Sequence, residues 1–138
     1  METIRLYRTR KGHPALWEQG GGATNTGYSQ IITNEDGTPK KPVYIRYRGS
    51  LSQGEHALFI VNIGDIIIKT DHHRKDFNIY IYKITSIGEE EAELQLLHEY
   101  TEGEWDVEPP PNLLPAITAA KDKATCYHCR EPHYYRQG

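Results

Sequence analysis

The chain carries only two cysteines, and both lie near its C-terminal end, at Cys126 and Cys129. This C-x-x-C spacing lets two thiolates bind one zinc ion, and His133 follows at a short interval. A tetrahedral site needs a fourth ligand, which His72 or His73 could supply from a distant segment. We therefore predict a structural zinc site that fastens the C-terminal tail to the rest of the protein.

The same residues have other interpretations. A C-x-x-C pair can be redox-active, but that motif normally opens a helix after a strand, and here it follows a predicted helix. The cysteines can also be ordinary residues of a terminal tail. A metal-dependent hydrolase would use His72, His73, Cys126 and Cys129 and would need an open coordination position. The two histidines fall within residues 70–76, which we expect to form a polar loop between two strands.

Cations alternate with aromatic rings in the N-terminal third of the chain. If Val43 and Ile45 face a core, the residues between and after them share the opposite face of the same strand. Cations bind phosphates and rings stack on bases, so this pattern is typical of a surface that binds single-stranded nucleic acid or a nucleotide. The candidate ligand-binding residues are Arg5, Tyr7, Lys40, Lys41, Tyr44, Arg46 and Arg48.

The formal net charge of −3 conceals an uneven distribution of charges. Residues 1–50 carry eight Lys or Arg against four Asp or Glu, whereas residues 86–114 carry nine acids and no Lys or Arg. Acidic runs are usually solvated, but Tyr100 and Trp105 interrupt this one, as aromatic anchors do at interfaces. A second hypothesis is therefore an inhibitor or adaptor of the kind found in phages and mobile elements, which would bind a basic protein partner.

The apolar pattern predicts a mainly β fold. Several segments alternate apolar and polar residues with a period of two, and one segment has the composition of a helix. We expect a small barrel-like antiparallel meander of about six to eight strands in residues 1–114. A short helix and a Cys/His tail are expected to follow in residues 115–138, packed on the barrel as part of one domain. The expected strands are residues 3–8, 28–33, 43–47, 56–62, 65–69, 77–84 and 91–98, and the expected helix is 115–123.

The composition also restricts the class of protein. A length of 138 residues suits a single domain, and no apolar run approaches the roughly 20 residues of a membrane span. Two close cysteines and no apolar leader favour a cytoplasmic protein. The glycine-rich residues 20–27 lack the Lys-Ser/Thr ending of a phosphate-binding loop. No nucleophile motif requires an enzyme, so the leading hypothesis is a β-barrel module that binds nucleic acid or a nucleotide.

Overall fold

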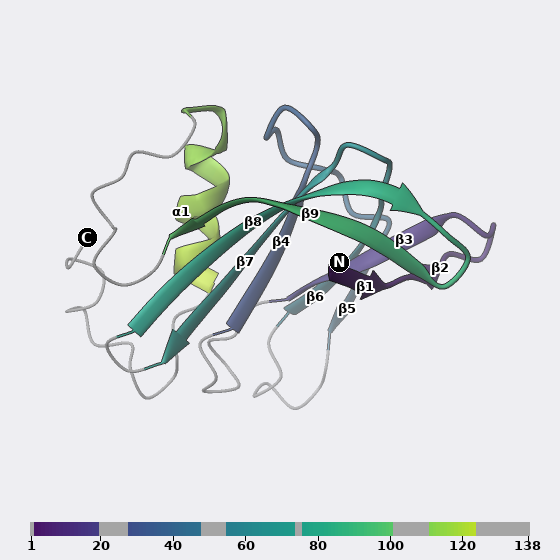
Figure 1. The fold of residues 1–138 in the computed structure, drawn as a ribbon. Helices are drawn as coiled ribbons and strands as arrows, with labels where there is room; N and C mark the ends of the chain where they lie inside the picture. The colour runs from purple at the N-terminus through teal and green to yellow at the C-terminus, as the bar shows by residue number, and fades with distance from the viewer. Residues whose placement is uncertain (1, 20–27, 48–54, 74–75, 101–110, 124–138) are drawn as a thin grey trace.

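The computed structural model describes residues 2–19, 28–47, 55–73, 76–100 and 111–123, which form antiparallel strands and one short helix (Figure 1). The strands are β1 (Glu2–Arg5), β2 (Tyr7–Arg8), β3 (Pro14–Gln19), β4 (Tyr28–Thr33), β5 (Tyr44–Tyr47), β6 (Glu55–Ile60), β7 (Ile66–His73), β8 (Asp76–Ile87) and β9 (Glu91–Tyr100). A 3₁₀ segment, η3 (Pro111–Leu113), leads into α1 (Leu114–Lys123). The expected mainly β fold with one short C-terminal helix is confirmed. Neither helical segment described is long and apolar enough to cross a bilayer.

The strands fall into two parts that meet twice. Strands β4, β7, β8 and β9 lie side by side and curve into a half-barrel, whereas β3, β6 and β5 form a smaller sheet (Figure 1). The two parts share one pair, Gln19 with Gln30, where β3 meets β4. The N-terminal segment joins them again, because β1 pairs with β9 and β2 pairs with β3. Between β1 and β2, the buried Leu6 donates its backbone N–H to Glu90 O at 2.8 Å.

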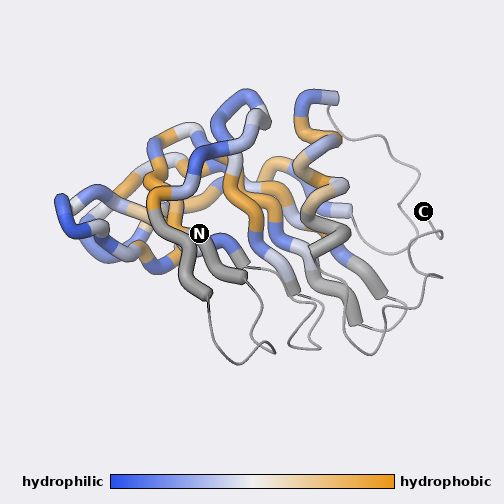
Figure 2. Tube along the Cα trace, turned by 180° about the vertical axis from the view of Figure 1, so that it is seen from behind, coloured by the Kyte–Doolittle hydropathy of each residue, from blue (hydrophilic) through white to orange (hydrophobic). Residues whose placement is uncertain are grey.

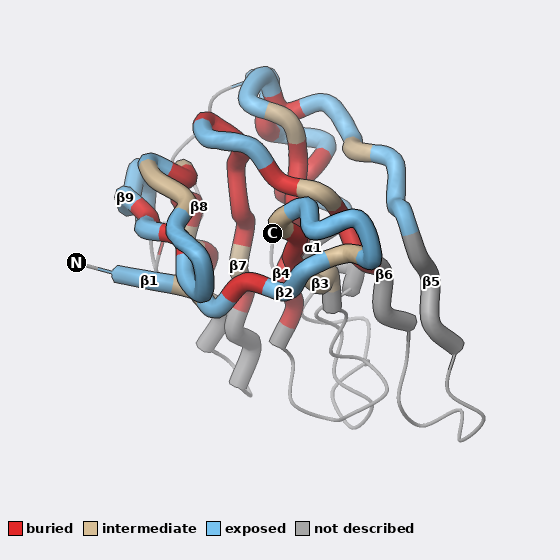
Figure 3. The backbone as a smooth tube through the Cα atoms, turned by 90° about the vertical axis from the view of Figure 1, so that its right-hand side faces the viewer, coloured by how far each residue is buried: buried red, intermediate tan, exposed pale blue. Residues whose placement is uncertain are grey.

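The central strands of the half-barrel, β4 and β7, are buried on both faces. On the convex face, Ile66 and Ile68 of β7 pack in one apolar cluster with Ala116 and Ile117 of α1. On the concave face, Ile67 belongs to a second cluster, which the N-terminal segment and the smaller sheet cover. Successive side chains of a strand point to opposite faces, so a strand covered on both faces needs a continuous apolar run. Figure 2 shows this apolar band along the central strands and α1, and Figure 3 shows that these strands are buried.

The turn at residues 34–37 does not join β4 and β5 as a hairpin. Thr33 pairs with Pro39 in a single bridge, after which the chain leaves β4. Pro39 and Pro42 lack the N–H that a continued ladder would need. Residues 44–47 therefore pair with β6 instead of β4, so the strand order is not fully sequential.

One expectation from the sequence was wrong in detail. Residues 70–76 were expected to be a loop, but β7 extends to His73 and β8 begins at Asp76, with His73 paired to Asp76.

Leu96 shares the strand face of Ala92 and Leu94, yet it is 44% exposed. It lies opposite Tyr82, where the alternation places it, but β1 ends at the level of Leu94 and leaves the next position uncovered.

The substitution Gly37→Ala is expected to destabilise the protein more than Gly12→Ala. Both glycines have a positive φ (86° and 87°), which costs a residue with a Cβ about 1–2 kcal/mol. A Cβ at Gly37 would also collide with the backbone oxygen of Asn112, whereas nothing lies within 4 Å of a Cβ at Gly12. We expect Gly37→Ala to lower the free energy of unfolding by at least ~1 kcal/mol more than Gly12→Ala does. If the two variants lose equal free energy of unfolding in chemical denaturation, η3 does not pack against this turn.

Candidate functional site

The pairing register of the smaller sheet brings distant aromatic residues to one face. Trp17 of β3 is opposite Leu58 of β6, and Leu58 is in turn opposite Tyr44 of β5. Residues directly opposite each other share a face of a sheet, so these three positions form one row. Two positions further along β5, on the same face, Arg46 is opposite His56. The row takes the alternate positions to Leu16 and Phe59, which belong to the concave core cluster. Within the row, Leu58 is buried and Trp17 is half-buried.

Tyr7 of β2 extends this surface. It pairs with Ala15 and is 45% exposed, and its ring meets the half-buried ring of Trp17 edge to face, with 6.1 Å between centroids. Gln30 Nε2 donates a hydrogen bond to the Trp17 carbonyl oxygen at 2.7 Å, which ties this part of β3 to β4. Three segments far apart in sequence therefore contribute to one surface. We call it the aromatic face and define it by Tyr7, Trp17, Tyr44, Arg46 and Leu58.

The cations near the aromatic face have different roles. Arg5 is exposed at the end of β1, where it is paired with Glu91 of β9. Lys41 is exposed just before β5. Arg8 holds the fold together: its guanidinium donates to the carbonyl oxygens of Gly12, Gly88 and Glu89 at 3.1, 2.9 and 2.9 Å. Arg48 lies outside the described residues.

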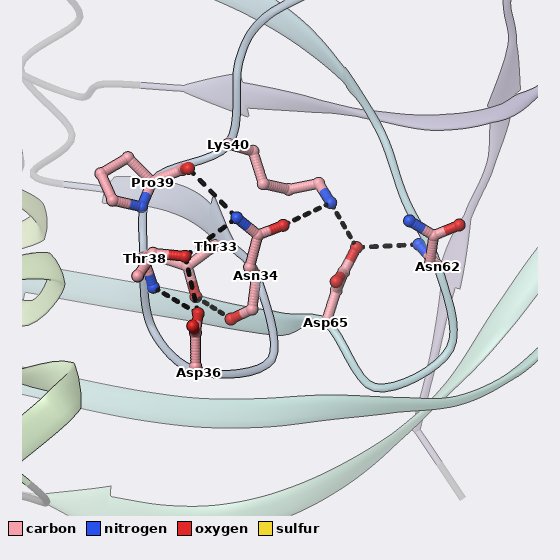
Figure 4. Close-up of polar contacts among 8 residues, drawn as sticks. All are labelled: Thr33, Asn34, Asp36, Thr38, Pro39, Lys40, Asn62 and Asp65. Carbon is pink, nitrogen blue, oxygen red and sulfur yellow. Dashed lines mark hydrogen bonds and ion pairs between the residues drawn. The ribbon is translucent and has the colours of Figure 1, made fainter.

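Lys40, which the sequence analysis grouped with the surface cations, lies inside the protein. Its Nζ is 2.8 Å from Asp65 Oδ2, and the two side chains are only 8% and 6% exposed (Figure 4). Asn34 Oδ1 accepts a second hydrogen bond from the ammonium at 3.2 Å, and the Asn62 backbone N–H donates to Asp65 at 2.8 Å. Lys40 therefore joins the 34–40 turn to the turn before β7.

A small pocket of about 240 Å³ lies where β4 separates from β3. Ile31 and Ile32 line it from β4, Phe59 from β6, and Pro115 and Ala116 from α1. Glu18 also lines it, and its Oε2 accepts a hydrogen bond from the Ile32 backbone N–H at 3.3 Å. This volume is below that of a typical pocket for a drug-sized ligand, so the aromatic face is the better candidate for a binding site.

The concave face carries a lysine between aromatic rings. Lys69 Nζ lies 5.3 Å from the centroid of the Tyr82 ring, within the range of a cation–π interaction. Burial lowers the pKa of Lys69, and the nearby Glu2 carboxylate partly offsets this effect. Burial also raises the pKa of the Tyr82 hydroxyl, with smaller contributions from Glu2, Tyr80 and Glu99. This contact between Lys69 and Tyr82 was not predicted from the sequence, because only the pairing of β7 with β8 brings the two residues together.

The predicted zinc ligands are only partly covered by the structure. Cys126, Cys129 and His133 lie outside the described residues. His72 and His73 are consecutive in β7, where they are opposite Phe77 and Asp76 of β8. Within the described ranges, no three His, Cys, Asp or Glu side chains gather as metal ligands do.

Comparison of the chain with protein-family models, curated proteins and solved structures found no match. The described residues themselves offer the exposed ring of Tyr7 against the half-buried ring of Trp17, a small pocket beside α1, and a half-buried lysine on the concave face.

The Lys40–Asp65 ion pair gives a direct stability prediction. Lys40→Met leaves the Asp65 carboxylate buried without its cation, so we expect a loss of about 3–5 kcal/mol in the free energy of unfolding. The double variant Lys40→Met, Asp65→Asn keeps an acceptor for the Asn62 N–H and removes both charges. The double variant should therefore lose less free energy of unfolding than Lys40→Met alone does. A single variant that loses under about 1 kcal/mol in urea denaturation would contradict this role.

The zinc site remains a prediction. Native mass spectrometry of the protein as purified, without chelator, should show one zinc per chain, and the Cys126→Ser, Cys129→Ser variant should show none. His72→Ala or His73→Ala should reduce the bound zinc if that histidine is the fourth ligand. A bare native mass of the unchanged protein would exclude the site, and full zinc in both histidine variants would exclude β7 as the source of the fourth ligand.

Proposed function

We propose that the protein is a binding module for single-stranded nucleic acid and that the aromatic face is its contact surface. The observation that carries this proposal is the register of the smaller sheet, which aligns Trp17, Leu58 and Tyr44 in one row beside Arg46. Tyr7 extends the row from β2, with a ring exposed enough to meet a ligand. Rings that follow one another across a sheet suit a strand of unstacked bases.

The chemistry of the aromatic face matches that ligand. The bases would stack on Tyr7 and Trp17, and such stacking tolerates any sequence because every base has a π face. Arg46 would bind a phosphate by charge-assisted hydrogen bonds. Duplex nucleic acid would fit less well, because its bases are already stacked on each other. We therefore expect weak sequence preference and a preference for single strands.

The acidic region of the protein is compatible with this proposal. The exposed acids of β9, Glu91, Glu93 and Glu99, belong to the half-barrel, whereas the aromatic face belongs to the smaller sheet. The overall charge of −3 therefore does not describe the surface near Arg46. A nucleic-acid backbone would meet the smaller sheet at Arg46 and stay clear of the acidic strand β9.

Two variants separate stacking from charge in this proposal. Binding of a fluorescein-labelled short oligothymidylate is measured by anisotropy over a range of salt concentrations. Tyr7→Ala should weaken binding by roughly 1–3 kcal/mol without changing the salt slope, because it removes a stacking ring. Arg46→Glu should weaken binding and reduce the slope of log K against log salt by about 0.7, because it removes a phosphate contact.

Lys83→Glu is the matched control for charge. Lys83 is a part-exposed cation on β8, 3.7 Å from Glu35 and remote in strand order from β5. Its reversal changes the net charge as much as Arg46→Glu does and should leave oligothymidylate binding nearly unchanged. If the three variants weaken binding equally, or if the unchanged protein does not bind the oligonucleotide, the aromatic face is not a nucleic-acid surface.

A further inference from the structure

Strand β9 is longer than the strand that pairs with its outer edge. β1 pairs with residues 91–94 of β9, whereas β8 pairs with the other edge as far as Tyr100. Among the described residues, no strand pairs with residues 95–100 on the side away from β8. Such an edge offers backbone N–H and C=O groups to an added strand.

The same stretch exposes two leucines. Tyr82 is opposite Leu96 and Ile81 is opposite His98, so Leu97 is the additional residue of a β-bulge. Leu96 is 44% exposed and Leu97 is 39% exposed. Adjacent exposed leucines along a strand edge are apolar area that a partner can bury, and this area lies apart from the aromatic face.

The charges around this edge select the kind of partner. Glu99 is exposed within the stretch, Glu2 is exposed at the end of β1 beside it, and Glu93 is exposed further along β9. Residues 86–100 contain no Lys or Arg. A second copy that paired with this edge would bring like charges together, which destabilises a strand pair. A strand with basic side chains would bring opposite charges together.

We propose that residues 95–100 of β9 form a docking edge for an extended basic segment of a protein partner, which adds to the half-barrel as a further strand. Backbone hydrogen bonds to the edge would supply the affinity, and side chains at alternate positions would supply the specificity. The apolar side chains of the segment would cover Leu96 and Leu97. Its basic side chains would lie near Glu2 and Glu99. This surface is independent of the aromatic face.

The test uses a fluorescein-labelled peptide of alternating valine or threonine and lysine, and a second peptide with glutamate in place of lysine. Anisotropy should show binding of the lysine peptide and none of the glutamate peptide. Hydrogen–deuterium exchange should show that the lysine peptide slows exchange of backbone amides within residues 95–100. Glu99→Lys should weaken this binding by at least about threefold, because it turns a cross-strand attraction into a repulsion.

Glu89→Lys is the matched control, because Glu89 is an exposed acid just before β9, away from the docking edge. It makes the same change in net charge and should leave peptide binding nearly unchanged, as should Tyr7→Ala on the aromatic face. If Glu89→Lys and Glu99→Lys weaken peptide binding equally, the binding reflects only general charge attraction, and the proposal is overturned. Amides in 95–100 that are already protected in the free protein would also overturn it, because another part of the chain would then cover this edge.

Discussion

A lysine ammonium and an aspartate carboxylate lie 2.8 Å apart inside this protein, and the arrangement of the connecting segments depends on them. Burial of either charge alone would cost several kcal/mol, so each side chain holds the other in place. Lys40 belongs to the connection between β4 and β5, and Asp65 is the last residue of the 62–65 turn before β7. The pair therefore fixes where the 34–40 turn lies, and the Asn112 side chain donates a hydrogen bond to the Asp36 carbonyl oxygen of this turn at 3.0 Å.

The two core clusters determine which surfaces remain for binding. One face of the half-barrel is covered by α1, and the other is covered by the N-terminal segment and the smaller sheet. Two described surfaces keep exposed aromatic or apolar side chains in positions set by strand pairing. These are Tyr7 of β2, beside the half-buried Trp17 of β3, and Leu96 and Leu97 in the part of β9 that extends beyond β1.

The sequence predicted most of the strands and the helix because both leave local signals, but no strand was expected at residues 14–19, where β3 lies. Alternation located β9, a run of β-branched and apolar residues located β7, and the composition of residues 115–123 located α1 to within one residue. The pairing partners were not predictable, because β3 with β6 and β4 with β7 are contacts between distant segments. Trp17 was missed for this reason, since only the register aligns it with Tyr44. Lys40 was grouped with exposed cations because nothing in its neighbourhood in the sequence shows that Asp65 will meet it.

The N-terminal strand has a consequence for how the protein is made. Glu2 pairs with Leu94, and the intervening chain includes nearly every other strand of the fold. Contacts between residues so far apart form late, because the entropy of closing a long loop must be offset first. On the ribosome, β1 emerges before β9 and lacks this pairing strand until residues 91–94 have been synthesised. The edge of β1 that pairs with β9 therefore stays open while β2 to β8 are made, a period in which a chaperone or a second nascent chain could bind it.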